Sequence, residues 1–460
     1  MALIKSISGF RGTIGGTAGQ NLTPQDIVEC TAAFGAWLLQ NGAASKVVIG
    51  RDARMSGAMV NALVVNTLVG LGIDVVDLGL STTPTVEMAV PEEEAGAGII
   101  ITASHNPKEW NALKFLNHKG EFISKADGKA LLQLLADGQI DYADVTKLGK
   151  HSTKDGYLEK HVAAILAMDL VNAEAVKDKR FKVVVDCVNS TGALAMPILL
   201  EALGCEVVLL HGDPTGDFAH NPEPLPKNLG DLSQMVLTEN ADLGIALDPD
   251  VDRLAFVSED GTFFGEEYTL VAVADYILGH QPGNTVSNLS STRALRDVTL
   301  RHRGTYYASA VGEVNVVTQM KAVGAVIGGE GNGGIIVPDL HYGRDALAGV
   351  ALFLSHLAAF GGKVSELRAT YPSYHIVKDK IALTPDIDID LLIATLHSKF
   401  QSEDCNTIDG LKIDFEEGWV HLRKSNTEPI IRVYAEHETA EKAQGLANML
   451  KSAAEVVIAK

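Results

Sequence analysis

The chain has few basic residues, with 38 Lys and Arg against 58 Asp and Glu and a formal net charge of −20. A protein that binds nucleic acid needs a basic face that replaces the counterions on phosphate, so this balance argues against nucleic acid as a partner. A small anionic substrate is still compatible with the composition, because a few arginines can make a positive cleft on an acidic protein.

Long apolar runs and paired cysteines are scarce as well. No segment reaches the roughly 18–20 apolar residues that a membrane-spanning helix needs, so we expect no membrane partner. The first residues lack the apolar stretch of a secretory signal, and we expect a cytoplasmic protein. The cysteines show no CxxC spacing, which fits free thiols in a reducing compartment rather than a zinc site: Cys30, Cys187, Cys205 and Cys405.

What the chain does have is length and a regular alternation of strand-like and helix-like segments. Its 460 residues exceed one ordinary domain, and about three or four domains are expected. Short β-branched runs such as 46–50 and 181–185 alternate with helical patterns such as 23–40 and 192–203. This alternation is typical of βαβ units and predicts an α/β fold with mostly parallel sheets.

Three segments repeat one pattern, in which a glycine precedes an apolar strand that runs into a polar loop. They begin at Gly98, Gly244 and Gly324, and the loops that follow read TASHNP, DPDVDR and GGEGNGG. Open α/β sheets place their chemistry at the carboxyl ends of the strands. If three similar α/β units each deliver one loop to a common cleft, all three loops serve one site.

The region after about residue 375 has a different pattern, with scattered strands and a closing helix from about residue 438. It predicts a smaller α+β domain with its own polar loop at 423–429. Linkers between the units are predicted near residues 150–170, 260–275 and 370–380.

The first loop presents the hydroxyl of Ser104 beside the imidazole of His105. A serine held at a strand end can become a covalent group carrier. His105 either bonds the substrate or orients the loop. Four more basic residues lie near strand or loop ends. Arg11 and Lys114 are candidate site residues, whereas Arg51 and Arg54 fit a structural ion pair as well as they fit a site.

The second loop places Asp248, Asp250 and Asp252 at alternate positions in a tight turn. Three carboxylates can converge on one hard cation, and oxygen-only ligands suit Mg²⁺. A solvated acidic turn is the simpler alternative. The turn also resembles the DxDx[TV] loop of aspartyl-phosphate phosphatases, but Asp252 stands where Thr or Val is expected, so Ser104 is the better candidate nucleophile.

The third loop formally contains GxGxxG after a strand, but the chain continues as Ile-Ile-Val-Pro338, which cannot open the helix that a dinucleotide site requires. We interpret it as a backbone loop that places Glu330 and Asn332 against sugar hydroxyls; a plain glycine-rich turn is the alternative. The fourth loop resembles a phosphate cradle, with an ordinary capping turn as the alternative. Its candidate ligands are Arg423, Ser425, Asn426 and Thr427, followed by Arg432.

These parts predict one reaction. A phosphoryl group would pass from a phosphorylated Ser104 to a sugar hydroxyl while Mg²⁺ neutralises charge. The cradle at 423–429 would hold a second phosphate, far from the reacting one. The substrate is therefore a phosphosugar.

The four loops, in this order, resemble the α-D-phosphohexomutase superfamily over essentially the whole chain: TASHNP, DPDVDR, GEGNGG and RKSNTEP. The resemblance implies three similar mixed-sheet α/β domains and a smaller C-terminal α+β domain around a central cleft. The expected limits are 1–160 with the phosphoserine loop, 161–268 with the metal loop, 269–375 with the sugar loop and 376–460 with the phosphate loop.

The same resemblance implies residue roles. Ser104 would be the phosphoserine, and its phosphate would bind Mg²⁺ together with the three aspartates of the second loop. Arg11 and Lys114 match positions where the family's general acid and base candidates lie, and His105 completes our predicted catalytic group. Predicted substrate-binding residues are Arg253, Glu330, Asn332, Arg423, Ser425, Asn426, Thr427 and Arg432. A hexose bisphosphate would be both intermediate and activator, and we expect a monomer or a homodimer.

The sugar is harder to predict. Loops reading GEMSGH are typical of phosphoglucomutase/phosphomannomutase and GEQSGH of bacterial phosphoglucosamine mutase, whereas this loop lacks both Ser and His and resembles archaeal-type phosphoglucosamine mutases. In the fourth loop, Asn426 stands at a position where asparagine is common among phosphomannomutases. Near the serine loop, Ala112 replaces the glycine of the usual Asn-Gly-x-Lys. We favour conversion of glucosamine 6-phosphate to glucosamine 1-phosphate. Phosphoglucomutase/phosphomannomutase, a Mg²⁺-dependent sugar phosphatase and a non-catalytic sensor are the alternatives.

Overall fold

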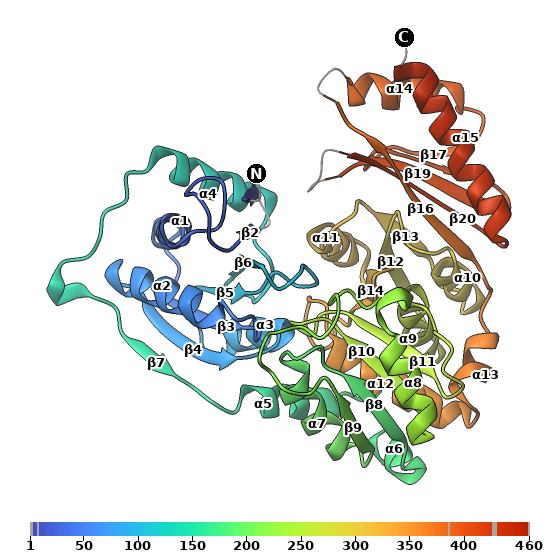
Figure 1. The fold of residues 1–460 in the computed structure, drawn as a ribbon, viewed down its shortest axis with the longest axis horizontal. Coiled ribbons are helices and arrows are strands. Elements are labelled where there is room, and N and C mark those ends of the chain that lie inside the picture. Colours follow the sequence, from blue (N-terminus) through green and yellow to red (C-terminus); the bar gives the residue numbers. More distant parts are fainter. Residues whose placement is uncertain (1–2, 7–8, 385–386, 426–429, 459–460) are drawn as a thin grey trace.

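The computed structural model describes residues 3–6, 9–384, 387–425 and 430–458. Two predicted phosphate ligands, Asn426 and Thr427, lie outside the described residues. The described chain forms four sheets in four successive α/β units, three of them with mixed sheets (Figure 1). The fold class predicted from the sequence is confirmed.

The first three sheets contain the same four-stranded arrangement. Within each, two parallel pairings join the first three strands, and the last strand runs antiparallel at their side. In spatial order these strands are β4 (Asp74–Leu80), β3 (Lys46–Arg51), β5 (Ala97–Ile101) and β6 (Trp110–Asn117); β9 (Glu206–Leu210), β8 (Lys182–Asp186), β10 (Leu243–Leu247) and β11 (Leu254–Ser258); and β13 (Tyr306–Ser309), β12 (Asn284–Asn288), β14 (Ala325–Glu330) and β15 (Gly334–Ile336).

This arrangement explains the repeat seen in the sequence. The three glycine-preceded segments are β5, β10 and β14, and each polar loop connects one of them to the antiparallel strand beside it. Every residue of β5 and β10 is buried, as expected for central strands covered on both faces. The three loops therefore occupy equivalent places in three similar units.

The remaining strands extend the first sheet and build the fourth. The first sheet gains β1 (Ile4–Ser6), β2 (Gly9–Thr13) and β7 (His151–Thr153). The fourth sheet is wholly antiparallel, and its order is β16 (His375–Ala382), β20 (Ile430–His437), β19 (Gly418–Lys424), β18 (Leu411–Asp414) and β17 (Asp404–Asn406).

Helices connect the strands and cover the sheets. Sequence signals mark several of their starts: Thr23 and Asp26 form a capping box at the first helix, with Pro24 at its first position. In chain order the helices are α1 (Pro24–Gln40), α2 (Gly57–Gly70), α3 (Thr83–Glu92), α4 (Lys125–Asp137), α5 (Tyr157–Leu166), α6 (Ala173–Lys179), α7 (Gly192–Ala202), α8 (Gly230–Glu239), α9 (Glu266–His280), α10 (Ala294–Arg301), α11 (Glu313–Val323), α12 (Ala346–Phe360), α13 (Val364–Ala369), α14 (Ile389–Lys399) and α15 (Ala440–Ile458).

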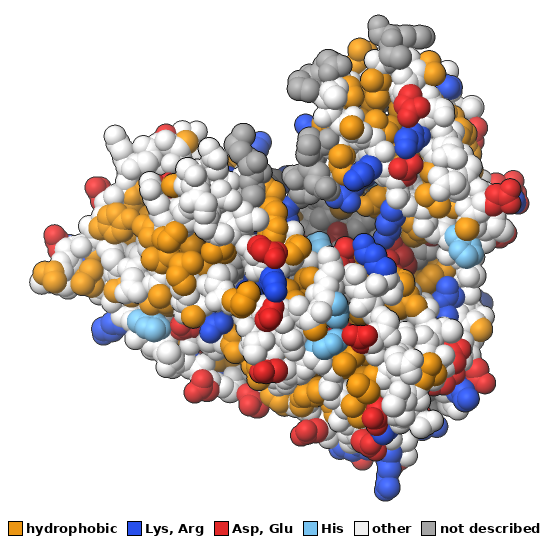
Figure 2. All heavy atoms as spheres, viewed as in Figure 1, with side chains coloured by type: hydrophobic (Ala, Val, Ile, Leu, Met, Phe, Trp, Pro, Cys, Tyr) orange, Lys and Arg blue, Asp and Glu red, His pale blue; other side chains and the backbone are white. Residues whose placement is uncertain are grey.

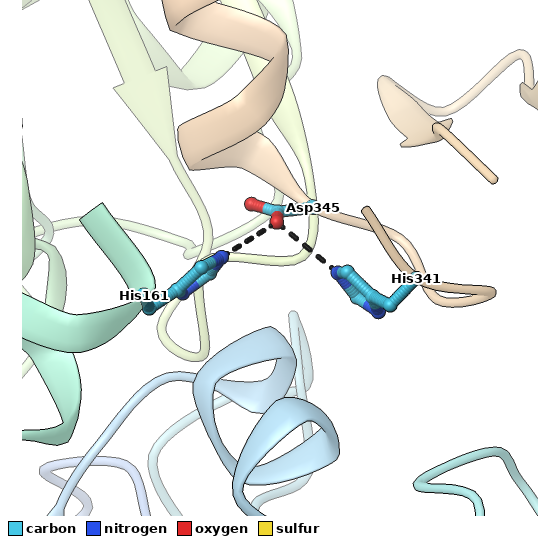
Figure 3. A group of neighbouring side chains, drawn as sticks. All are labelled: His161, His341 and Asp345. Carbon is cyan, nitrogen blue, oxygen red and sulfur yellow. Dashed lines mark hydrogen bonds and ion pairs between the residues drawn. The ribbon is translucent and has the colours of Figure 1, made fainter. Parts of the chain in front are cut away.

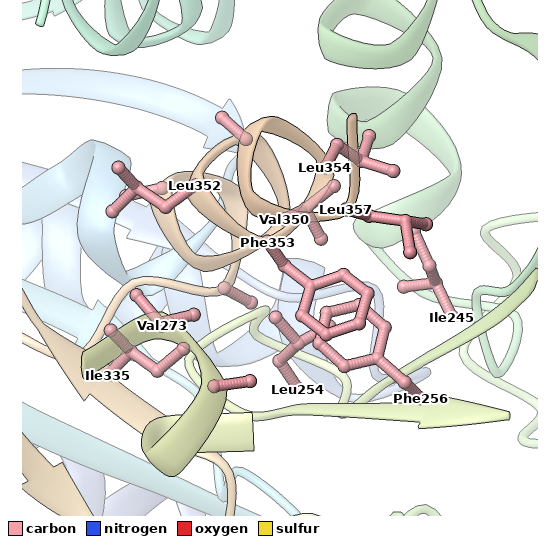
Figure 4. Close-up of a cluster of buried hydrophobic side chains, with 14 of the residues drawn as sticks. Ile245, Leu254, Phe256, Val273, Ile335, Val350, Leu352, Phe353, Leu354 and Leu357 are labelled. Atoms are coloured by element: carbon pink, nitrogen blue, oxygen red, sulfur yellow. The ribbon is translucent and has the colours of Figure 1, made fainter. Parts of the chain in front are cut away.

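The second and third units share one hydrophobic core, which the sequence alone does not reveal. A single cluster of buried side chains runs from Val162 to Tyr371. At its centre Phe353 of α12 stacks on Phe256 of β11, with ring centroids 3.8 Å apart (Figure 4). The first and fourth units have separate cores. The metal and sugar loops are thus held on one packed body, while the serine and phosphate loops belong to others. The domain limits predicted at 160 and 268 fall inside α5 and α9 and stay predictions.

A buried polar cluster joins the first three units (Figure 3). Asp345 Oδ2 lies 2.8 Å from His161 Nε2 and 3.1 Å from His341 Nε2, and Asp345 Oδ1 caps α12 by accepting the backbone N–H of Ala348 at 3.0 Å. The opposite nitrogen of His341 lies 3.3 Å from Glu87 Oε2 on α3. Burial alone would lower the pKa of His341, but Asp345 and Glu87 raise it to about 10.

This cluster predicts a loss of stability in alkaline solution. The pKa of His341 is about 10 in the fold against an ordinary 6.5. Its stabilising charge is therefore fully present below pH 6.5 and is lost as pH rises through about 10. Burial raises the pKa of Glu87 to about 8, which has the same sign, because the folded state holds the extra proton. We expect His341→Asn to destabilise the protein at neutral pH and the deficit to shrink as pH rises.

Thermal unfolding midpoints of wild type and His341→Asn, measured at pH values across this range, check the expectation. His375→Asn, at an exposed position on β16, is the control and should follow the wild-type profile. Parallel profiles for wild type and His341→Asn would contradict the prediction.

Candidate active site

Loops from the first two units meet at Ser104. Its Oγ donates a 2.8 Å hydrogen bond to Asp248 Oδ2, which is 144 residues away in the chain. His105 Nδ1 lies 3.4 Å from the same Oγ. Ser104 is 7% exposed and Asp248 is fully buried. The serine hydroxyl and the imidazole of the first loop thus meet the aspartate turn at 248–252, here called the metal turn, which was predicted from a separate motif.

The backbone of the serine loop is held in an uncommon conformation. Ser104 has φ +49°, in the left-handed region that non-glycine residues seldom adopt. Its N–H donates to Thr102 Oγ1 at 2.9 Å, and the Thr102 hydroxyl donates to Asp52 Oδ2 at 2.7 Å. Such strain clusters at functional sites, where the surrounding structure fixes one geometry. Here that geometry directs Oγ at Asp248.

Arg54 clamps the same loop from behind. Its guanidinium donates to the carbonyl oxygens of Ser104 and Asn106, to those of Pro107 and Trp110, and to the Asp52 carboxylate. All five N–H groups of the guanidinium are thereby used. The interpretation of Arg54 as an ion-paired residue agrees with its 2.9 Å contact to Asp52. The sequence did not reveal its hold on the serine loop, since those contacts span 50 residues and more.

The three aspartates of the metal turn are all fully buried, and one ligand oxygen from each lies within 4.8 Å of the others. Asp250 Oδ2 accepts from Thr83 Oγ1 at 2.6 Å and Lys114 Nζ at 2.8 Å. The turn also forces Val251, a β-branched residue, to φ +61°. Within the described part of the chain, Asp250 Oδ1 and Asp252 Oδ1 have no hydrogen-bond partner.

Buried carboxylate oxygens without partners are costly, and a hard divalent cation bound among them would remove that cost. The donor set therefore fits a metal ion. Burial raises the pKa of Asp248 well above its ordinary value, and the charges of Asp252 and Asp250 add to that rise. A cation bound here would compete with the proton on Asp248.

Basic groups around the turn differ in protonation. Burial would lower the pKa of Lys114, but Asp250 and Asp252 raise it, so Lys114 stays charged. Burial, Arg253 and Arg344 hold the pKa of His105 well below its ordinary value, so the imidazole is neutral at pH 7. Burial and repulsion from Arg253 lower the pKa of Arg11, on β2. A neutral imidazole therefore lies beside the serine, and a charged lysine lies against the metal turn.

The third loop places Glu330 at the end of β14, 5% exposed. Oε1 accepts from Asn288 Nδ2 at 2.9 Å and Gly312 N at 3.1 Å. Oε2 accepts from Arg344 Nη1 at 2.9 Å and Asn332 Nδ2 at 3.4 Å. A carboxylate has about four acceptor positions, so a sugar hydroxyl that binds Glu330 must displace one of these donors. Asn332, at the longest distance, is the donor most easily released.

Arg344 is the main residue that the motif analysis missed. Its Nη2 donates to Asp252 Oδ2 at 2.6 Å, in addition to the bond from Nη1 to Glu330. These two contacts join the metal turn to the sugar loop. Arg344 lies just before α12 and carries no motif of its own; Asp345, which caps that helix, is the nearest local signal.

The phosphate loop lies in the fourth unit. Arg423 and Arg432 face each other across β19 and β20, at the base of the hairpin that contains the predicted cradle. Arg423 Nε lies 2.9 Å from Asp409 Oδ2, and Ser425 N donates to Ile430 O at 2.9 Å. In Figure 1 these strand ends lie on the side of the fourth unit that faces the first. Figure 2 shows the surface hollowed between these two units, with Lys and Arg side chains along one wall.

Comparisons with known proteins agree with this geometry. Four family domains match in order: phosphoglucomutase/phosphomannomutase alpha/beta/alpha domains I (residues 4–139), II (155–261) and III (265–374), and the C-terminal domain (377–453). The chain belongs to the phosphoglucomutase/phosphomannomutase family. It is a phosphohexomutase, as the sequence motifs predicted, of a metal-dependent family. No helix in the described ranges is long and apolar enough to cross a membrane.

Curated relatives carry two kinds of name. A probable phosphoglucosamine mutase of Methanopyrus kandleri is 35% identical over 442 residues, covering 95% of each chain. A phosphoglucomutase/phosphomannomutase of Thermococcus kodakarensis is 36% identical over 439 residues, covering 94% of this chain and 95% of its own. A phosphoglucosamine/phosphogalactosamine mutase of Sulfurisphaera tokodaii is 30% identical and covers 99% of this chain and all of its own.

Solved structures show the same fold. A phosphoglucomutase/phosphomannomutase family protein of Burkholderia thailandensis matches with a TM-score of 0.86 at 26% identity, covering 98% of this chain and 97% of its own. The N-acetylphosphoglucosamine mutase of Aspergillus fumigatus, solved with GlcNAc-6P and magnesium, matches with a TM-score of 0.55 at 17% identity over 89% of this chain and 82% of its own.

Proposed function

We propose that the protein interconverts hexose 6-phosphates and hexose 1-phosphates through a phosphoserine at Ser104, and that glucosamine phosphate is its preferred substrate. The observation that carries the role of Ser104 is its 2.8 Å hydrogen bond to Asp248, within a buried turn of three carboxylates. A phosphatase that uses an aspartyl nucleophile and a non-catalytic sensor have no need of a strained serine aimed at a metal turn. A phosphatase in which water attacks phospho-Ser104 does need one, and release of free phosphate distinguishes it from a mutase.

In the proposed reaction the free hydroxyl of the phosphosugar attacks the phosphorus of phospho-Ser104. The bond from phosphorus to Ser104 Oγ breaks as the new P–O bond forms, and the hydroxyl proton passes to a base. The resulting hexose bisphosphate then returns its other phosphate to Ser104. Neutral His105, 3.4 Å from Oγ, is the base candidate, while charged Lys114 offsets the negative charge that builds up.

The metal is proposed to be Mg²⁺, held by Asp248, Asp250 and Asp252. An all-oxygen donor set favours Mg²⁺ over softer metals, and the Aspergillus fumigatus structure contains magnesium. When bound, the ion would neutralise charge on the transferring phosphoryl group. The distant phosphate is proposed to bind Arg423, Ser425, Asn426, Thr427 and Arg432. Arg253 is proposed to bind the substrate near the phosphoryl group that is transferred.

Glucosamine is favoured by two observations. The third loop has Asn332 and Gly334 in place of the Ser and His of other mutases, and two of the relatives above are named for glucosamine. Glu330 and Asn332 are proposed to exchange their mutual 3.4 Å contact for bonds to the sugar. Phosphoglucomutase/phosphomannomutase activity is the second candidate, because the Thermococcus kodakarensis relative at 36% identity has that name.

The test is a panel of glucosamine, glucose, mannose and N-acetylglucosamine 6-phosphates, each with Mg²⁺ and a trace of the matching bisphosphate. The 1-phosphate and free phosphate are measured in parallel. We expect isomer without free phosphate, and the highest kcat/KM for glucosamine. A higher kcat/KM for glucose or mannose would overturn the choice of sugar, and free phosphate without isomer would overturn the mutase reaction.

A further inference from the structure

The guanidinium of Arg344 contacts carboxylates from three separate segments. Nη2 donates to Asp252 of the metal turn at 2.6 Å, and Nη1 donates to Glu330 of the sugar loop at 2.9 Å. Nε lies 3.1 Å from Oε2 of Glu313, at the start of α11. Arg344 is 7% exposed, so these charges meet out of water, where removal of one partner leaves the others uncompensated.

Gly334 leaves the space through which Arg344 reaches these partners. A Cβ at Gly334 would lie 2.3 Å from Arg344 Cδ and 3.1 Å from Asn332 Oδ1. The backbone of Gly334 does not require glycine, since it has no positive φ. The glycine is therefore needed for the room it gives the arginine. The related loops quoted above end in histidine at this place, whereas this chain has Gly334.

We propose that Arg344, placed in the space beside Gly334, is a positioning residue that fixes the metal turn and the sugar loop in one geometry. Arg344 engages Asp252 Oδ2, and among the described residues Asp252 Oδ1 has no hydrogen-bond partner, which leaves it available as a cation ligand. It also holds one oxygen of Glu330 while the weaker bond to Asn332 can open. The inference rests on the proposed function, because it assigns metal and sugar contacts to those two loops.

The test is a double-mutant cycle of Gly334→Ala, Arg344→Ala and the double variant, with turnover of the preferred sugar phosphate as the first readout. Displacement of a positioned group by about 1 Å can cost about 100-fold in rate, and we expect a loss of that order in kcat for Gly334→Ala. KM should change little, because the distant phosphate binds in the fourth unit. In the Arg344→Ala background the side chain that would clash with the new Cβ at position 334 is gone. The double variant should therefore be no slower than Arg344→Ala alone.

Gly230→Ala is the matched control, since a Cβ at Gly230 meets no atom within 4 Å, and it should keep wild-type kcat. Full activity of Gly334→Ala, or losses that simply multiply in the double variant, would overturn the proposal. So would an equal rise in KM and fall in kcat/KM with kcat unchanged.

Mg²⁺ binding by calorimetry gives a second readout that needs no turnover. Gly334→Ala should change the Mg²⁺ dissociation constant when Arg344 is present and leave it unchanged in the Arg344→Ala background. Equal changes in both backgrounds would overturn the coupling. If wild type turns over none of the sugar phosphates, the proposed function fails, and this binding cycle alone then decides whether Arg344 positions the metal turn.

Discussion

Replacing Ser104 with alanine is expected to lower mutase turnover by about 10⁴-fold or more, because it removes the group that carries the phosphoryl between substrates. The hydroxyl is one heavy atom, and its loss removes the 2.8 Å hydrogen bond to Asp248 and the 3.4 Å contact with His105 Nδ1. The thermal midpoint should therefore stay close to that of wild type. Steady-state turnover of the 6-phosphate and the intact mass after incubation with hexose bisphosphate check both expectations, with a phosphate-sized addition only in wild type.

Ser81→Ala is the matched control for this variant. Ser81 is buried in the same unit, and its hydroxyl has no hydrogen-bond partner among the described residues. Its removal should leave turnover and phosphorylation unchanged. Near-normal turnover of Ser104→Ala, or a phosphate-sized addition that persists in it, would refute the carrier role of Ser104.

Replacing Asp250 with asparagine is expected to lower turnover by about 10³-fold. A metal ion supplies several kcal/mol of charge stabilisation in such reactions, and each 1.36 kcal/mol is a factor of ten. The change removes the whole negative charge of a carboxylate whose Oδ1 has no hydrogen-bond partner among the described residues and whose Oδ2 lies 2.8 Å from Lys114 Nζ. Mg²⁺ affinity should fall together with turnover.

Initial rates and calorimetry during Mg²⁺ titration of chelator-treated protein measure this effect. Chelation should abolish wild-type turnover and added Mg²⁺ should restore it, whereas Asp250→Asn should need far more Mg²⁺ and stay slow. Asp339→Asn, at an exposed position of the third unit, is the control and should titrate like wild type. Undiminished Mg²⁺ affinity in Asp250→Asn would show that the turn is not the metal site.

The parts of the candidate site that were predictable are those built within one contiguous stretch. Ser104 and His105 are neighbours in a strand-end loop, and Asp248, Asp250 and Asp252 lie in one turn. Their chemistry follows from residue type and spacing alone. The repeated glycine-strand-loop pattern also predicted correctly that three equivalent loops exist, because it reflects a strand order that all three units share.

Other parts depend on contacts between distant segments. Arg54 holds the serine loop through carbonyl oxygens 50 or more residues away, and Arg344 contacts Asp252 across 92 residues. A backbone carbonyl has no residue type that a sequence could signal. The acceptor positions of Glu330 were likewise expected to face a sugar, but donors from Asn288, Gly312, Asn332 and Arg344 fill them in the structure.

The sequence by itself therefore determined the reaction class and the α/β architecture, and it predicted the nucleophile and the metal turn, because local residue patterns carry each of them. Tertiary structure alone decided which charges meet. The shared core of the second and third units, with Phe256 stacked on Phe353, sets the metal turn beside the sugar loop. Arg344 can then reach both, because folding buries it where no water competes for its three carboxylates.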